Sequence, residues 1–323
     1  MAEGSGFGKV ILFNEHFVVY GVPAIASAIS NKTVAKVTEA ESLKPSGNEG
    51  SMVGNGWVLE DNRDANEGYK TKKLEHQKES IELVLNAADF IADETPIKIE
   101  LGGDLKAVGG VGASAAVCVS IARALSKEFE LGFDDDKINE IAYEGEKAYA
   151  GTPSGIDNTA STYGGLLWFV KNTEGGANTM DLMELKEPLE IVMGNTGITT
   201  DTKAAVEGVR ERKEGNPEYE KIFARAHELG KEALIALNDF NLEKVGALMN
   251  ENHGMLQKIG VSHEKLDELV EIAQENGALG AKMTGGGMGG YMLALTPGKE
   301  LQEKVAKAME DTGYEALRTK IGV

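Results

Sequence analysis

The chain has 323 residues, a formal net charge of −19 and 41% hydrophobic residues. This length suits two lobes of roughly 150 residues each. The negative charge disfavours nucleic acid and anionic membranes as partners, because both would be repelled. The only cysteine is Cys118, so no intramolecular disulfide can form. With no signal-peptide pattern and no apolar run of about 18 residues, we expect a cytoplasmic protein.

Residue patterns predict the elements of the first half of the chain. β-branched and aromatic residues favour a strand at 8–13 and another at 17–29, which Gly21 and Pro23 interrupt. The polar, glycine-rich stretch 42–72 is expected to form a hairpin or a mobile flap. The next predicted elements are a helix at 76–92, a strand at 96–101, helices at 115–131 and 135–149, and strands at 165–170 and near 180–185.

The second half of the chain has the same mixture of helices and strands. The predicted elements are a strand at 189–195, helices at about 202–212, 217–238, 241–257 and 262–276, a glycine turn leading into a strand within 281–296, a helix at 299–312 and a strand near 314–321. Because the strands and helices do not alternate regularly, we expect an α+β fold with two lobes, 1–186 and 187–323.

A glycine-rich segment at 109–116 (GGVGASAA) precedes the predicted helix at 115–131. Glycines let backbone N–H groups approach an anion closely, and a helix N-terminus adds free donors and about half a positive charge. Ser114 is placed to cap this helix or to contact a metal ion on bound phosphates. The spacing fits neither a Walker loop nor a dinucleotide fingerprint. The segment is therefore either a phosphate-binding loop or a plain capped turn.

Two carboxylates lie eleven residues apart near the middle of the chain. Glu146 is near the end of a predicted helix, and Asp157 follows in a turn rich in proline, glycine and serine (GTPSGID). Such a turn fixes the orientation of a carboxylate, as a metal ligand or a general base requires. The alternative is that Asp157 only caps the segment that follows it.

The N-terminal strand carries polar residues at both ends. Lys9 enters an apolar strand, where a charge is costly unless it is paired, and Glu15 and His16 stand where the strand ends. Near the C-terminus, the run KMTGGGMGGY (282–291) has five glycines within six positions. It is either a flexible turn or a loop that lies against a substrate or a phosphate.

Together, these four motifs resemble those of the GHMP kinases, which include galactokinase, homoserine kinase, mevalonate kinase and phosphomevalonate kinase. The resemblance covers nearly the whole chain, with the motifs in the family's order. Within the family, the stretches 8–29, 151–165 and 199–210 are most similar to mevalonate kinases of the archaeal type. The resemblance implies a two-lobed α+β fold, with an N-terminal lobe like the second domain of ribosomal protein S5 and a ferredoxin-like C-terminal lobe.

The resemblance also implies an activity and its site residues. The activity is ATP-dependent phosphorylation of the 5-hydroxyl of mevalonate, or of a similar small alcohol, by a homodimer in isoprenoid precursor synthesis. Asp157 corresponds to the catalytic aspartate, Lys9 to the lysine that contacts it, and Ser114 and Glu146 to the ligands of Mg²⁺. The residues that the resemblance implies for binding the ATP phosphates are Gly109, Gly110, Val111, Gly112, Ala113, Ser114 and Ala115. The residues that it implies for contacting the substrate are Lys9, Glu15, His16, Asp157, Thr202, Thr284, Gly285 and Gly286.

The chain departs from the family pattern at three of these motifs. Asn14 and Met288 stand where the family usually has glycine, and Ala113 replaces the first of two serines. The alternatives are therefore another GHMP kinase, acting on phosphomevalonate or a sugar, or a non-catalytic nucleotide-binding protein. Lys9, Ser114, Glu146 and Asp157 argue against the non-catalytic alternative, because such a protein has no chemical need for all four.

Overall fold

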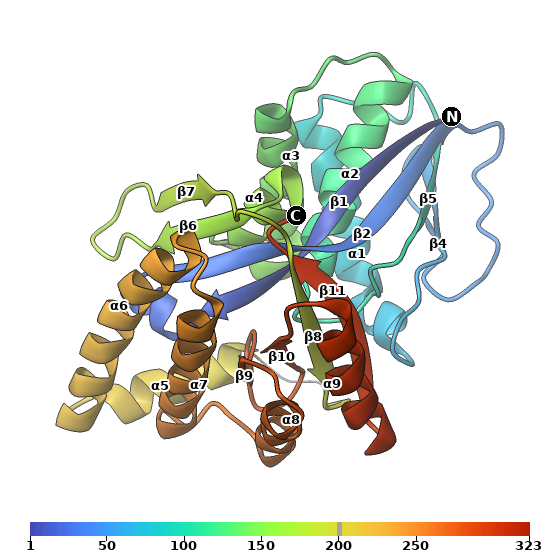
Figure 1. Cartoon of the computed structure of the whole chain (residues 1–323). Helices are drawn as coiled ribbons and strands as arrows, with labels where there is room; N and C mark the ends of the chain where they lie inside the picture. Colours follow the sequence, from blue (N-terminus) through green and yellow to red (C-terminus); the bar gives the residue numbers. More distant parts are fainter. Residues whose placement is uncertain (199–201) are drawn as a thin grey trace. The chain divides into compact units, whose positions relative to one another are not determined.

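The computed structural model describes residues 1–198 and 202–323 (Figure 1). The chain forms two compact units, one of Met1–Lys9 with Ser30–Gly164 and the other of Val10–Ile29 with Gly165–Val323. Two strands, β1 (Ala2–Phe13) and β2 (Ala24–Glu39), contribute residues to both units. The predicted lobe boundary at 186 stays a prediction, since these units divide the chain at other points.

The first unit combines strands with four helices. Its strands pair in the order β3-β4-β5-β2, where β4 and β5 are parallel and the other pairs are antiparallel. Besides parts of β1 and β2, the unit contains β3 (Met52–Val53), β4 (Trp57–Asp61), α1 (Tyr69–Ala87), β5 (Ile97–Gly103), α2 (Ala113–Glu128), α3 (Asp135–Ala150) and α4 (Ile156–Tyr163).

The core of this unit lies between its strands and its helices. Along β2, the side chains of Thr33, Ala35 and Val37 are buried while those between them are less so, which is the alternation of a strand with one covered face. Ala35 and Val37 join a cluster with Ile121 of α2 and Ile141 of α3. The buried face of α2 therefore fixes the position of the helix that follows the glycine-rich segment.

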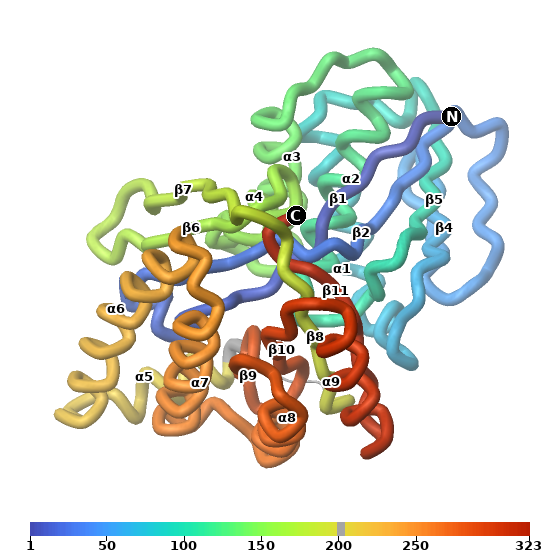
Figure 2. Tube along the Cα trace, in the orientation of Figure 1, coloured from blue at the N-terminus to red at the C-terminus, as the bar shows by residue number. Residues whose placement is uncertain are grey.

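The second unit also mixes strands and helices. Its strands β9, β10, β8 and β11 are antiparallel neighbours in that order, and Figure 2 shows the C-terminal strand β11 beside β8. The elements of this unit are a 3-10 helix at Phe17–Tyr20, β6 (Leu166–Val170), β7 (Thr179–Met183), β8 (Leu189–Asn195), α5 (Thr202–Lys213), α6 (Pro217–Asn238), α7 (Leu242–Lys258), α8 (Glu264–Glu275), β9 (Gly280–Met283), β10 (Tyr291–Leu295), α9 (Lys299–Asp311) and β11 (Glu315–Ile321).

The α+β class is confirmed, and most predicted elements are present. The predicted strand at 17–29 is wrong over its first part, because 17–20 is a 3-10 helix entered from His16, whose φ is 61°. The helix α4 was not predicted, since it is short and rich in serine, threonine and asparagine, which have low helix propensity. Over the described residues, no helix is long and apolar enough to span a bilayer.

We predict that Gly6→Ala destabilises the protein. A Cβ at Gly6 would lie 2.5 Å from the backbone oxygen of Ala116 in α2 and 2.9 Å from the Ser161 hydroxyl oxygen in α4. Such overpacking costs about 1–3 kcal/mol of unfolding free energy, which urea denaturation measures. The control is Gly102→Ala in β5, where no atom would lie within 4 Å of the new Cβ. Equal stabilities of the two variants would contradict this account of the β1 contact.

Candidate functional site

The glycine-rich segment 109–112 leads directly into α2 in the first unit. Gly110 and Gly112 have φ values of 92° and 69°, a region that favours glycine. The N–H of Lys9 donates a 2.8 Å hydrogen bond to the oxygen of Val111, which holds the segment against β1. A Cβ on Gly112 would lie 3.1 Å from both the N and the Cβ of Lys9. Bare backbone is therefore required just before the free N–H groups of the helix.

The side chains of Lys9 and Asp157 form an ion pair beside this segment. The Nζ of Lys9 lies 2.7 Å from Oδ1 of Asp157, and their side chains are 9% and 34% exposed. Asp157 lies in the first turn of α4, after Gly155, whose φ of 89° ends the loop. The helix cap is Gly155 and not Asp157, so the capping interpretation of this carboxylate is wrong. A buried cation thus orients a carboxylate that is open to a further partner.

Glu146 of α3 is buried next to this ion pair. Burial raises the pKa of its carboxyl group to about 7, and the nearby Asp157 charge adds to the increase; a hydrogen bond from Ser114 and the charge of Lys9 oppose it. Ser114 therefore contacts Glu146 and does not cap α2, whose cap is Gly112. Of the side chains that the structure describes, none offers a hydrogen bond to Oε1 of Glu146. A cation next to this oxygen would stabilise the carboxylate form of Glu146 and would therefore lower its pKa.

The donors around Glu146 suit Mg²⁺. This ion usually takes one or two protein oxygens and completes its coordination with water and substrate phosphates. The Glu146 carboxylate and the Ser114 hydroxyl are oxygen donors in contact with each other, at the start of α2. Within 1–198 and 202–323, no group of three or more His, Cys, Asp or Glu could hold a metal ion by itself. A metal ion here would need further ligands from water or a bound phosphate.

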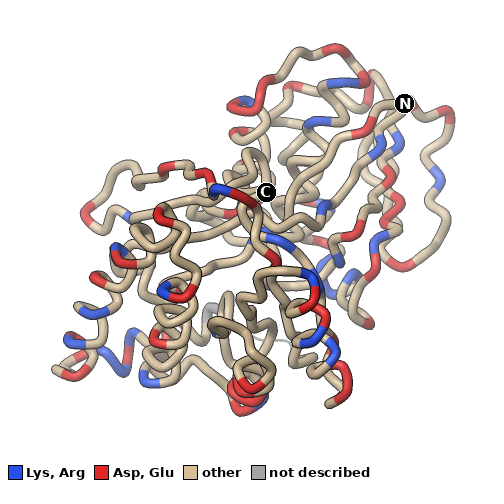
Figure 3. The backbone as a smooth tube through the Cα atoms, in the orientation of Figure 1, with Lys and Arg blue, Asp and Glu red and all other residues tan. Residues whose placement is uncertain are grey.

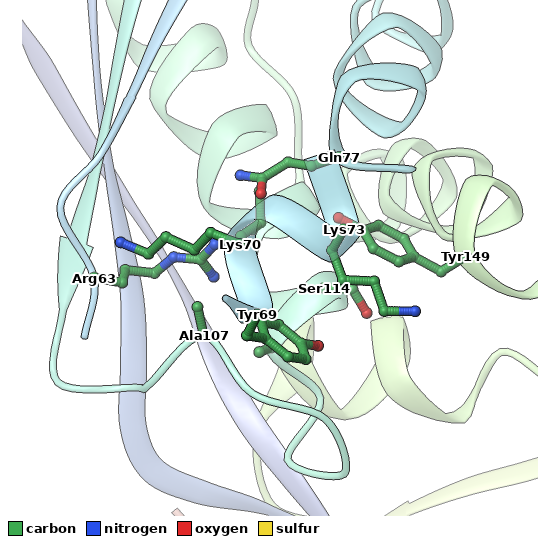
Figure 4. Close-up of a pocket in the computed structure, with 10 residues that line it drawn as sticks. Arg63, Tyr69, Lys70, Lys73, Gln77, Ala107, Ser114 and Tyr149 are labelled. Carbon is green, nitrogen blue, oxygen red and sulfur yellow. The ribbon is translucent and has the colours of Figure 1, made fainter. Parts of the chain in front are cut away.

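Ser114 also lines a pocket (Figure 4). Its lining includes three basic side chains, although the chain as a whole is acidic (Figure 3). The residues are Arg63, Tyr69, Lys70, Lys73, Gln77, Ala107, Ala113, Ser114, Val117 and Tyr149. These cations beside the glycine-rich segment create the local positive site that an anionic ligand would require in a chain of net charge −19.

Asp61 holds two of these basic residues. Arg63 donates from Nε and from a terminal nitrogen to the two carboxylate oxygens, at 3.0 and 2.7 Å, and Lys70 donates to the Asp61 backbone oxygen at 2.8 Å. Burial alone would raise the pKa of Asp61, but Arg63 and Lys70 keep that pKa below its usual value. Asp61 therefore stays ionised and fixes both cations at the pocket wall.

The second unit holds the other predicted site residues. Glu15 forms an ion pair with Lys282 at the end of β9, and both side chains are fully buried. The Nε2 of His16 lies 2.9 Å from the Gly286 oxygen, and the Thr284 hydroxyl donates to the Ile11 oxygen at 3.0 Å. Burial is the main cause that lowers the pKa of His16, so its ring is neutral at pH 7. The N-terminal motif and the C-terminal glycine loop thus form one network.

Two departures from the family pattern occupy left-handed backbone. Asn14 has a φ of 71° and Met288 a φ of 58°, in the region where glycine is the usual residue.

Thr202 is the first residue of α5, but its side chain lies outside the described residues, as do residues 199–201. Among the glycines of the loop, Gly285 and Gly287 have φ values of 81° and 72°.

Four basic residues near the candidate site were not predicted from the sequence: the partner of Glu15 and three residues that line the pocket. Lys282 lies in β9 (Gly280–Met283), a short strand before the glycine run that the sequence did not predict; a lysine in a buried strand needs a pairing partner, so recognising that strand would have singled it out. Arg63, Lys70 and Lys73 gave no such signal, since they stand in a polar stretch or on an amphipathic helix where basic residues are usually solvated.

We predict that Glu146→Gln stabilises the metal-free protein at pH 8. A carboxyl group whose pKa rises from 4.5 to about 7 on folding binds more protons in the folded state between these values. Stability therefore falls as the pH rises through this window, and glutamine removes the loss. The gain should be about 1–3 kcal/mol at pH 8 and shrink towards pH 4.5, as urea denaturation can measure.

The exposed Glu140→Gln on the same helix is the control and should change stability little at either pH. A gain for Glu146→Gln that is the same at pH 5 and pH 8 would contradict the raised pKa.

Comparisons with known proteins agree with this geometry. The family model described as the N-terminal domain of GHMP kinases matches residues 80–165, and that described as their C-terminal part matches residues 231–315. The mevalonate kinases of Pyrococcus abyssi and Pyrococcus furiosus are each 37% identical to 97% of this chain, over 93% and 94% of their own lengths. A solved structure of L. major mevalonate kinase in complex with R-mevalonate has a TM-score of 0.90 at 32% identity, covering 99% of this chain and 96% of that one. The expected GHMP kinase fold is confirmed, and the chain belongs to the mevalonate kinases of the GHMP kinase family.

Proposed function

We propose that this chain transfers the γ-phosphoryl group of ATP to the 5-hydroxyl of mevalonate. The observation that carries the proposal is the Lys9–Asp157 ion pair, with its half-exposed carboxylate beside Glu146 and the phosphate loop. Phosphoryl transfer depends mainly on positioning and electrostatics, so a fixed carboxylate, a cation and a phosphate cradle are sufficient.

ATP is proposed to bind in the first unit. Its phosphates would accept hydrogen bonds from the N–H groups of loop 109–112 and of the first turn of α2. The adjoining pocket, with Arg63, Lys70 and Lys73, would take the rest of the nucleotide. Ser114 and Glu146 would hold Mg²⁺, which would neutralise charge on the phosphates when bound.

Asp157 is proposed to act on the substrate hydroxyl. Its carboxylate would orient the hydroxyl in line with the γ-phosphorus and accept the proton as the new O–P bond forms and the bond to the ADP oxygen breaks. Lys9 would hold the Asp157 carboxylate in place through the charge-assisted contact between them. Lys9 would also offset the charge that develops in the transition state.

The residues proposed to contact mevalonate are Lys9, Glu15, His16, Asp157, Thr202, Thr284, Gly285 and Gly286. The solved relative from L. major was crystallised with R-mevalonate, which supports this choice of acceptor. Glu15 is neutralised by Lys282, so its charge does not repel a substrate carboxylate. The family resemblance further supports the proposal of a homodimer. The net charge of −19 supports the proposal that nucleic acid is not a partner, and a cytoplasmic location is also proposed.

We predict that Asp157→Asn lowers mevalonate-dependent kcat by about 10²–10⁴-fold, because the amide cannot accept the hydroxyl proton. ATP affinity, measured by isothermal titration, should stay within about twofold of wild type, since the phosphate loop is untouched. The control is Asp181→Asn on the exposed strand β7. Near-normal turnover of Asp157→Asn would rule out the proposed role.

We predict that Ser114→Ala weakens the use of magnesium. The variant loses both a proposed oxygen ligand and the hydrogen bond to Glu146. The Mg²⁺ concentration that gives half-maximal rate should rise about 10-fold or more, as a steady-state titration at fixed ATP can measure. Ser120→Ala, on the same helix with its hydroxyl bonded to the Val117 oxygen, serves as the control. An unchanged Mg²⁺ requirement in Ser114→Ala would contradict the metal role.

A further inference from the structure

The turn that carries Glu15 and His16 has an unusual backbone. Asn14, just before Glu15, has a φ of 71°. His16, just after it, has a φ of 61°. Residues other than glycine rarely adopt this region, although asparagine does so more readily than most. Such a conformation persists when its surroundings over-determine it. The contacts of Asn14 therefore decide how firmly the turn is held.

Asn14 is fully buried, and both its backbone and its side chain are hydrogen-bonded. Its N–H donates to Oδ1 of Asn252 at 3.1 Å, and its own Oδ1 accepts from Nδ2 of Asn252 at 3.2 Å. The Nδ2 of Asn14 donates to the backbone oxygens of Pro23 at 2.6 Å and Ala226 at 2.9 Å. The single side chain thus connects the turn to α6, to α7 and to the start of β2.

The sequence makes room for this amide. Gly230, in the middle of α6, costs helix stability relative to alanine, so its presence needs a packing reason. A Cβ at Gly230 would lie 2.9 Å from Nδ2 of Asn14 and 2.9 Å from the Pro23 oxygen. The missing side chain therefore leaves the space that the Asn14 amide and its acceptor occupy.

A glycine at position 14 would adopt the same φ at less cost but could not make the side-chain bonds. The backbone bond to Asn252 would remain, while three hydrogen bonds of the amide would be lost. The side chain of Asn14 contributes contacts that the usual glycine of the family cannot supply. These contacts fix the turn from which Glu15 and His16 reach Lys282 and Gly286.

We propose that Asn14 is a positioning residue, whose amide pair with Asn252 holds the Glu15–His16 turn in the conformation that binds the acceptor alcohol. This inference rests on the proposed function, in which Glu15 and His16 meet mevalonate. Asn14 itself acts through the turn and not by touching the reacting atoms.

The first test is Asn14→Gly, which suits the backbone and removes only the side-chain bonds. We expect the KM for mevalonate to rise about fivefold to tenfold, the effect of one or two net hydrogen bonds. The KM for ATP should stay within about twofold of wild type, because the phosphate loop belongs to the other unit. Steady-state kinetics with each substrate varied in turn measures both constants.

The second test examines the amide pair itself. Asn252→Asp keeps the acceptor for the Asn14 N–H but replaces the donor to the Asn14 Oδ1 with an oxygen. This variant should raise the mevalonate KM in the wild-type background and have a smaller effect when Asn14 is already glycine. Because the two residues are in contact, their effects should not multiply.

A matched control separates positioning from stability. Gln302 is a buried amide of the same unit, and its Nε2 also donates to two backbone oxygens, those of Ile191 and Thr319, each at 2.8 Å. Gln302→Ala should lower the Tm and leave the mevalonate KM within about twofold of wild type.

The outcomes distinguish this inference from the proposed function. An Asn14→Gly enzyme with a lowered Tm but an unchanged mevalonate KM would overturn the positioning role, as would an equal rise in both KM values. A wild-type enzyme that uses a different acceptor would overturn only the proposed substrate. The same comparison of KM values, made with that acceptor, would still decide the role of Asn14.

Discussion

The ion pair between Lys9 and Asp157 is the interaction on which the proposed chemistry of the first unit depends. Lys9 is buried, so its charge needs a partner, and Asp157 supplies it from the first turn of α4. Glu146 brings a second carboxylate into the same buried space, where burial raises its pKa and the nearby Asp157 charge adds to the increase. The site is therefore short of positive charge until a cation arrives. The proposed metal–nucleotide complex would supply this charge to residues from three distant stretches of sequence.

The amino-acid sequence was enough to single out the candidate site residues of this unit. Lys9 stood out as a charge in an apolar strand, and loop 109–114 stood out as bare backbone before a helix. The structure adds what those patterns could not contain, namely that Ser114 contacts Glu146 and that Asp61 fixes Arg63 and Lys70. Partners such as these are brought together by the fold. No spacing in the sequence predicts which of many surface-like lysines and arginines will line a pocket.

In the second unit, local sequence signals misled where backbone geometry was unusual. The apolar residues at 17–20 favoured a strand, but the left-handed turn at Asn14 and His16 redirects the chain into a 3-10 helix. A glycine at position 14 would have signalled the turn more strongly than asparagine does. Asn14 donates hydrogen bonds to Asn252 in α7 and to Ala226 in α6, and these bonds set the conformation of the turn. Because both partners are distant in sequence, local propensity cannot predict this conformation. The same bonds make the turn a rigid support for Glu15 and His16.

The most direct test of the account is the identity of the alcohol that the purified chain phosphorylates. ADP release would be measured with MgATP against mevalonate, phosphomevalonate, galactose and homoserine, and the product of any turnover would be identified by phosphorus NMR. The account predicts turnover with mevalonate alone and a phosphate ester at its 5-oxygen. ATP binding without turnover on any of the four alcohols, or turnover only with another acceptor, would contradict it.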